Sequence, residues 1–273
     1  MDLSTVEAIL PADRAAIEDW RPGDAWLAGG TWLFSEPQPE LRRLLDLTAF
    51  GWPALTPGRD GLEIAATCTL ADLIRHRGPA RWPATALIPE CCHALLGSFK
   101  VWNAATVGGN LCLALPAGPM ISLATALDGV CTVWGRSGQM TSIPALEFVT
   151  GPGENALAPG AVLRSVFLPD AALRCLTAFR QFSLSPVGRS AVVVIGRLAP
   201  ATGETVIGVT ASLPRPAQFR FDRPPSAEEL RDALDEAQLD YYDDVHGDPA
   251  WREHLTRTCT EEVRRELEEG KRA

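Results

Sequence analysis

Leu27-Ala28-Gly29-Gly30-Thr31 and Thr106-Val107-Gly108-Gly109-Asn110 are the two stretches of this sequence that decide its fold. Each places a pair of glycines after a short apolar run. Paired glycines permit a positive φ and a close backbone approach, so successive N–H groups can converge on a phosphate without a lysine. Two such nests would suit a diphosphate, with the side chains of Thr31, Thr106 and Asn110 adding hydrogen bonds. The alternative is that both are ordinary tight turns, in which glycine is common.

Composition and charge set the next limits. The chain has 273 residues, of which 46% are hydrophobic and 22% charged, as is typical of a globular protein. Its formal net charge is −9 and its pI about 5.0, which disfavours nucleic-acid binding because phosphates require a positive field. Asp2 and Glu7 lie where a signal peptide would carry positive charge. We expect no nucleic acid partner, no membrane span and a cytoplasmic location.

Cysteine and histidine spacing gives no metal site. The seven cysteines include no C-x-x-C pair and the four histidines show no ligand spacing, so neither a disulfide framework nor a zinc or iron-sulfur site is indicated. The adjacent Cys91 and Cys92 are either a redox-active pair or two small core side chains, and the general burial of free cysteine favours the core. We expect no metal held by this chain.

Familiar catalytic and nucleotide signatures are also missing. No G-x-x-x-x-G-K-[ST] loop or G-x-S-x-G elbow occurs. The nearest match to a dinucleotide fingerprint, Gly151–Ala156, leads towards Pro159 and not into a helix that would hold a pyrophosphate. We therefore expect no catalytic residue in this chain, and any redox chemistry must come from a bound cofactor.

Apolar periodicity and turn residues predict the remaining elements. Helices are expected over 13–20, from a cap at Thr69 to residue 75, and over 85–97 and 120–127, with strands over 25–28, 62–66, 130–134, 139–143 and 162–168. Three further strands, over 176–182, 191–198 and 206–213, form a meander. Two helices follow it. The first begins with a capping box, Ser226-Ala227-Glu228-Glu229, and the second has Asp248 as its N-cap. This arrangement indicates a separate α+β domain that begins near residue 173.

Taken together, the motifs resemble a known family. The segment 27–31, followed by 98–111, is similar to the FAD-binding medium subunit of the molybdenum hydroxylases, the xanthine dehydrogenase and carbon monoxide dehydrogenase flavoprotein family. The similarity continues through four later segments, 123–128, 156–160, 178–181 and 243–255. It covers nearly the whole chain, and the two Gly-Gly motifs in this order are specific to the family.

The resemblance implies an α+β fold in two parts. Residues 1–172 would form a PCMH-like FAD-binding domain of two α/β subdomains, about 1–55 and 56–172. Residues 173–273 would form a C-terminal antiparallel sheet with helices, as in carbon monoxide dehydrogenase flavoproteins. This agrees with the element pattern described above.

The resemblance also implies a set of cofactor-binding residues. The FAD diphosphate and ribityl chain would be lined by Ala28, Gly29, Gly30, Thr31, Trp32, Thr106, Val107, Gly108, Gly109 and Asn110. Leu163 would touch the isoalloxazine, and Arg180 stands where related enzymes have a lysine near the flavin. Three positions depart from the family pattern: Trp32 replaces an Asp or Asn, Leu115 a serine and Pro119 an aspartate. Direct side-chain bonds to FAD are not expected there.

The implied function is that of one subunit in an oxidoreductase. A partner large subunit would carry molybdopterin, a partner small subunit would carry two 2Fe-2S clusters, and this subunit would pass electrons through FAD to NAD or another acceptor. Two alternatives stay open. One is a structural or assembly subunit of the same kind of complex that binds flavin weakly or not at all, and the other is a stand-alone flavin oxidase.

Overall fold

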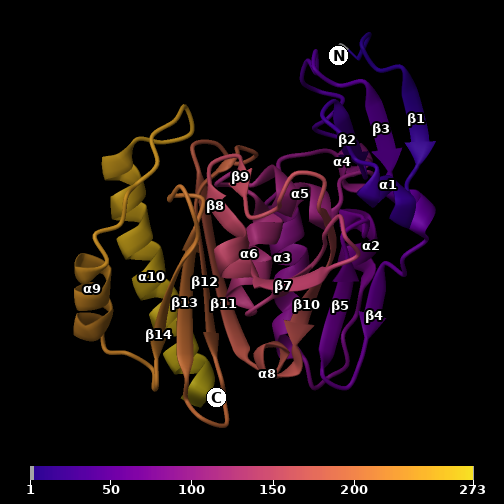
Figure 1. The fold of residues 1–273 in the computed structure, drawn as a ribbon. Helices are drawn as coiled ribbons and strands as arrows, with labels where there is room; N and C mark the ends of the chain where they lie inside the picture. Colours follow the sequence, from indigo (N-terminus) through magenta and orange to yellow (C-terminus); the bar gives the residue numbers. More distant parts are fainter. Residues whose placement is uncertain (1–2, 273) are drawn as a thin grey trace.

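The computed structural model describes residues 3–272 (Figure 1). The N-terminal unit contains β1 (Ala8–Pro11), α1 (Arg14–Glu18), β2 (Asp24–Leu27), β3 (Arg43–Asp46) and the 3-10 turn η1 (Leu47–Phe50). Its three strands are parallel in the order β1-β3-β2. Asp24, at the start of β2, is buried and pairs with Arg43 on β3 at 2.6 Å, and this partner lowers the pKa of Asp24. The pair fixes the strand that leads into the first glycine motif.

A second sheet forms the middle of the molecule. Its antiparallel strands lie in the order β4-β5-β10-β6-β7, and their bounds are β4 (Leu55–Pro57), β5 (Gly61–Ala65), β10 (Val162–Pro169), β6 (Val130–Trp134) and β7 (Met140–Pro144). Strands β8 (Val149–Gly151) and β9 (Glu154–Asn155) form a separate two-stranded ribbon. The predicted strands over 62–66, 130–134, 139–143 and 162–168 are confirmed.

Short helices cover this sheet. They are α2 (Leu70–Arg75), η2 (Pro83–Ala86), α3 (Leu87–His93), α4 (Phe99–Trp102), α5 (Val107–Leu113), α6 (Pro119–Ala126), α7 (Ala145–Phe148) and α8 (Asp170–Leu173). Thr69 caps α2 as predicted, through a bond from the Asp72 N–H at 3.1 Å. The predicted helix over 85–97 is shorter than expected and begins with η2. Helix α5 was not predicted, because its first turn contains two glycines, which disfavour helix.

The C-terminal part is an antiparallel sheet backed by two long helices (Figure 1). Strands β11 (Leu176–Ser183), β12 (Ser190–Leu198), β13 (Thr205–Thr210) and β14 (Ala217–Phe221) pair in sequence order. The meander is confirmed, and β14 is a fourth strand that was not predicted. Helices α9 (Ala227–Glu236) and α10 (Pro249–Arg272) lie on the outer side of this sheet, while α3 and α6 lie on its inner side.

Helix α6 connects the two large sheets. All eight of its residues are buried, and it contacts β12 and β13 on one side and α5 and α7 on the other. The largest hydrophobic core accordingly includes Val193, Ile195 and Ala211 of the C-terminal part together with the side chains of the middle sheet. The predicted domain boundary between residues 172 and 173 stays a prediction. In the structure, the largest hydrophobic core includes residues from both sides of it.

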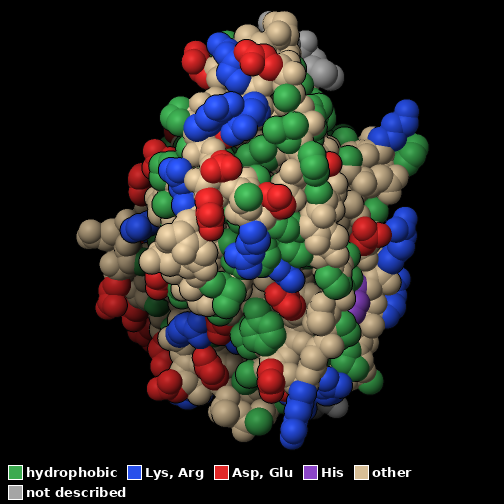
Figure 2. Space-filling model, turned by 45° about the vertical axis from the view of Figure 1, so that its right-hand side comes forward, with side chains coloured by type: hydrophobic (Ala, Val, Ile, Leu, Met, Phe, Trp, Pro, Cys, Tyr) green, Lys and Arg blue, Asp and Glu red, His purple; other side chains and the backbone are tan. Residues whose placement is uncertain are grey.

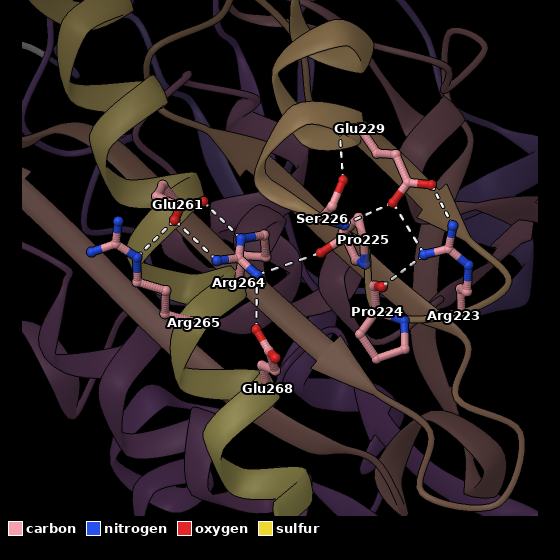
Figure 3. Close-up of polar contacts among 9 residues, drawn as sticks. All are labelled: Arg223, Pro224, Pro225, Ser226, Glu229, Glu261, Arg264, Arg265 and Glu268. Carbon is pink, nitrogen blue, oxygen red and sulfur yellow. Dashed lines mark hydrogen bonds and ion pairs between the residues drawn. The ribbon is translucent and has the colours of Figure 1, made fainter.

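The start of α9 is capped by its own side chains and is hydrogen-bonded to α10 (Figure 3). The Ser226 hydroxyl accepts the Glu229 N–H at 3.2 Å, and the Glu229 carboxylate accepts the Ser226 N–H at 2.7 Å, so the predicted capping box is confirmed. From α10, Arg264 pairs with Glu261 at 2.7 Å and donates to the Pro225 carbonyl at 3.5 Å. The start of α9 is therefore held by its own cap and by its neighbour.

The surface carries mixed charge. In the view of Figure 2, acidic and basic side chains are interspersed with hydrophobic ones over the visible face, and neither sign gathers into a continuous patch. Over residues 3–272, no helix combines the length and the apolar character needed to cross a bilayer.

Replacing Ser226 by Ala removes the hydroxyl that caps α9. We expect the free energy of unfolding to fall by about 1 kcal/mol, the usual cost of losing such a cap. Chemical denaturation of wild type, Ser226→Ala and Ser226→Asp measures it. Ser226→Asp keeps an acceptor at the N-cap and should stay close to wild type; equal losses in both variants would contradict the capping role.

The capping carboxylate also makes stability pH-dependent. Bonds from the Ser226 N–H and from Arg223 lower the pKa of Glu229 from 4.5 to about 2. The stabilisation is therefore fully present above pH 4.5 and is lost as the pH falls towards 2. Wild type should exceed Glu229→Gln in thermal stability at pH 7, and this difference should shrink between pH 4.5 and 2. A difference that did not vary over this range would contradict the assignment.

Candidate cofactor-binding cavity

The two glycine motifs meet at one cavity. Its volume is about 540 Å³, which lies within the usual range for a small-molecule site. It is bounded by the loop after β2, the segment after α3, helix α5 and the end of the β11–β12 turn. The predicted cofactor-binding residues that line it are Ala28, Gly29, Gly30, Thr31, Trp32, Thr106, Gly109 and Asn110.

The first motif presents free donors to this cavity. Among the described residues, no atom accepts a hydrogen bond from the backbone N–H groups of residues 29–33. Gly30 has φ +67°, in the left-handed region that a nest of converging N–H groups requires. The turn closes through the Phe34 N–H, which donates to the Gly30 carbonyl at 2.8 Å. Because backbone donors are rarely left without an acceptor, this stretch is suited to binding an anion.

Gly29 joins the two motifs physically. A Cβ atom at Gly29 would lie 1.6 Å from the carbonyl oxygen of Ala104 and 2.6 Å from its carbonyl carbon. Only glycine permits this approach of one backbone to another. The strand end that carries the first motif is therefore packed directly on the segment that leads into the second motif.

The second motif differs from its prediction, because Gly108 and Gly109 form no nest. They lie in the first turn of α5, and every backbone N–H from 107 to 110 is already bonded. Those of Val107 and Gly108 donate to the carbonyls of Cys68 and Ala66, each at 2.9 Å, and that of Asn110 donates to Thr106 at 3.0 Å. The Thr106 hydroxyl accepts the Gly109 N–H at 3.0 Å.

Close packing, and not a positive φ, explains the second glycine pair. A Cβ at Gly108 would lie 2.5 Å from the Cβ of Ala66, so glycine lets α5 approach the end of β5. Val107 and Gly108 face this contact, are buried, and do not line the cavity. Gly109 is exposed to the cavity and leaves its wall without a side chain. The motif therefore shapes the cavity and does not supply converging amides.

Asn110 contributes a polar group to the cavity wall. Its Oδ1 accepts the Met120 N–H at 2.9 Å, which ties α5 to the start of α6. This bond defines the amide orientation, so the NH2 group is the part of the side chain that is available to a ligand.

Two predicted residues lie away from the cavity. Leu163, on β10, is 3% exposed within the main core. Arg180, on β11, pairs with Glu262 at 2.7 Å and with Glu266 at 2.8 Å, both on α10. Side chains alternate along a strand, and Arg180 shares its face with Ala178, which packs in the core beneath α10. The structure does not bring these two residues to the cavity, and their contact with a cofactor stays a prediction.

Of the three positions that depart from the family pattern, two line the cavity and one does not. Trp32, which is 39% exposed, and Leu115 both line the cavity, whereas Pro119 is buried at the first position of α6. Because Pro119 does not line the cavity, the change from aspartate to proline at this position removes no polar group from the cavity wall.

Most of the remaining wall is apolar and consists of residues outside the two glycine motifs, which the sequence analysis did not predict. It includes Trp26, Leu27, Leu33, Ala94, Leu95, Leu96, Val101, Ala105, Cys112, Leu113, Ala117, Gly118 and Arg189. Helical periodicity counted from Gly109 would have found Cys112 and Leu113, had α5 been recognised. The sequence carries no comparable signal for Arg189, which reaches the cavity from the C-terminal sheet.

Burial raises the pKa of the thiols in and near the cavity. Desolvation raises the pKa of Cys112 to about 12, so its sulfur stays protonated at neutral pH. Cys91 and Cys92 on α3 are fully buried, and burial raises the pKa of both, to about 12 for Cys92. This agrees with the core interpretation of the pair. Among the described residues, no group of three or more His, Cys, Asp or Glu side chains is placed to hold a metal ion.

Comparison with solved structures gives chains of similar fold. Quinoline 2-oxidoreductase from Pseudomonas putida 86 has a similar chain, with TM-score 0.82, 21% identity and 99% of both chains covered. Carbon monoxide dehydrogenase from Oligotropha carboxidovorans gives TM-score 0.79 and 20% identity, covering 97% of this chain and 99% of that one. These likenesses show a shared fold.

Sequence comparison gives the family. Residues 12–171 match the model of the FAD binding domain in molybdopterin dehydrogenase. The chain belongs to this family, which confirms the resemblance and gives FAD as the cofactor. Xanthine dehydrogenases 1 and 2 of Arabidopsis thaliana are 28% identical over 122 residues, which is 42% of this chain and 9% of each relative. The chain thus spans only a small part of those proteins.

The residues present fit FAD. The unpaired N–H groups of 29–33 offer donors for a diphosphate, and the apolar remainder of the wall suits ring systems. Both glycine motifs contribute to this one cavity.

Replacing Gly29 by Ala forces a methyl group into the Ala104 carbonyl. We expect the free energy of unfolding to fall by about 1 to 3 kcal/mol, as for other overpacked sites, and FAD affinity to fall at least about tenfold, because the two motifs must separate. Denaturation and equilibrium titration with FAD measure both effects. Gly58→Ala is the control, since a Cβ there lies 3.6 Å from its nearest neighbour. Wild-type affinity in Gly29→Ala would contradict the role given to this contact.

Proposed function

We propose that this chain is the FAD-binding electron-transfer subunit of a molybdenum-containing hydroxylase or dehydrogenase. Electrons would enter from 2Fe-2S clusters in a partner subunit and leave to NAD or another acceptor. The observation that carries the proposal is the single cavity lined by both glycine motifs. The chain belongs to an oxidoreductase family, and FAD, when bound, supplies the redox chemistry.

The chain's own residues bind and orient the cofactor. The N–H groups of 29–33 would donate to the diphosphate, and Asn110 would add its side-chain amide. Trp26, Leu95 and Leu113 form apolar wall, which would exclude water from the ring systems. No titrating thiol competes, because the sulfur of Cys112 remains protonated.

The family and the structural neighbours support a proposal about partner subunits. One neighbour is a carbon monoxide dehydrogenase from Hydrogenophaga pseudoflava that lacks the Mo-pyranopterin moiety of its molybdenum cofactor. Its chain gives TM-score 0.79 at 19% identity, with 95% of both chains covered. By analogy with the family, we propose a molybdopterin-binding large subunit and a 2Fe-2S small subunit as partners of this chain. The cytoplasmic location predicted from the sequence accompanies this proposal.

Purification of the chain alone and with candidate partner subunits tests the proposal. The isolated chain should be yellow, and heating should release FAD. In the assembled complex, reducing the iron-sulfur clusters should bleach the flavin absorbance. Flavin that stays oxidised while the clusters are reduced would contradict an electron-transfer role.

Titration with FAD separates the structural alternative. Trp32 and Leu115 line the cavity where the family pattern has polar residues, and this is the observation that favours the alternative. In that alternative the chain binds no flavin and acts as a scaffold. Micromolar or tighter binding would exclude that alternative, and turnover by the chain without partners would favour a stand-alone oxidase.

A further inference from the structure

The cavity contains a single charged side chain. Among the described residues that line it, only Arg189 carries a charge at neutral pH, and every other side chain of the wall is apolar or neutral and polar. FAD carries two negative charges on its diphosphate, and its ring system gains negative charge on reduction. A cavity built for this cofactor therefore has one cation to offer.

Arg189 is held at the cavity but has no partner of its own. It is partly buried and makes no hydrogen bond or ion pair with any described residue. Its backbone is fixed on both sides, since the Gly188 N–H donates to the Ser185 carbonyl at 2.9 Å and the buried Ser190 hydroxyl accepts from Gln181 at 2.9 Å. A partly desolvated guanidinium without an acceptor is unfavourable, and a bound anion would compensate it.

The other candidate cation is already neutralised. Arg180 lies on the face of the sheet that packs against α10, where Glu262 and Glu266 pair with it. Arg189 lies at the end of the β11–β12 turn, directly before β12, and lines the cavity. At the position that the family resemblance assigns to a cation, Arg180 is thus held in ion pairs with α10, while the unpaired Arg189 lies nine residues later in the sequence.

We infer that Arg189 contacts bound FAD and pairs with its negative charge. The inference deepens the proposed function and depends on its cofactor. The C-terminal sheet thereby contributes a binding residue to a site whose other walls come from the N-terminal half. The charge is that of the diphosphate or that of the reduced ring, and the two sources have different signatures.

Three variants of the full chain test this inference. Arg189→Gln removes the charge and Arg189→Lys keeps it. Arg231→Gln is the matched control, because Arg231 is an exposed arginine on α9 whose loss changes the net charge equally. The affinity for oxidised FAD is measured by titration, competition by ADP is measured alongside, and the midpoint potential of the bound flavin is measured by reductive titration.

A diphosphate contact would weaken oxidised FAD and ADP binding at least about tenfold in Arg189→Gln and leave the potential unchanged. A contact with the reduced ring would leave those affinities unchanged and lower the potential by about 30 mV for each tenfold weakening of reduced-flavin binding. Either result, with Arg189→Lys close to wild type, supports the inference.

Unchanged affinity and potential in Arg189→Gln, or an equal change in Arg231→Gln, would overturn the inference while leaving the proposed function intact. Absence of FAD binding in the wild-type chain would overturn both.

Discussion

The approach of Gly29 to the carbonyl of Ala104 is the contact on which the site depends. It brings the end of a parallel strand in the N-terminal unit onto the backbone that precedes α5, without any side chain between them. The cavity exists because these two backbones meet there while Thr31, Trp32 and Gly109 remain on its open side. The ion pair between Asp24 and Arg43 supports this contact, because it fixes the strand that carries Gly29.

The sequence predicted most of the helices and strands. It also predicted the free N–H groups of the first glycine motif, but not the structure of the second motif. Alternation and caps are local signals, so the meander and the capping box of α9 could be recognised. The free amides of the first motif follow from a local turn around Gly30. Those of the second motif do not, because the carbonyls of Ala66 and Cys68 that accept them come from a distant segment. Nor could α5 be recognised, since Gly108 is needed for packing against the end of β5 and Gly109 lies at the cavity.

The contact predicted between Arg180 and the flavin stays a prediction, and it depends on more than the sequence around Arg180. Sequence similarity placed Arg180 correctly on a strand, but which face of the strand meets which neighbour is a property of the assembled sheet. Here α10 covers the face of Arg180, and its two glutamates take the charge. Arg189, after an irregular turn, had no periodic signal at all. The charged partners of a side chain are thus harder to predict from sequence than the backbone conformation at a glycine.

Helix α6 has a consequence for how this molecule could be divided. A helix that is buried on every side has no polar face to present to water, so neither half of the chain can carry it alone. Cutting the protein between the middle sheet and the meander would strip one side of α6 and expose apolar surface to aggregation. Evolutionary exchange of C-terminal parts between relatives would therefore have to preserve the inner faces of β12 and β13, which pack against that helix.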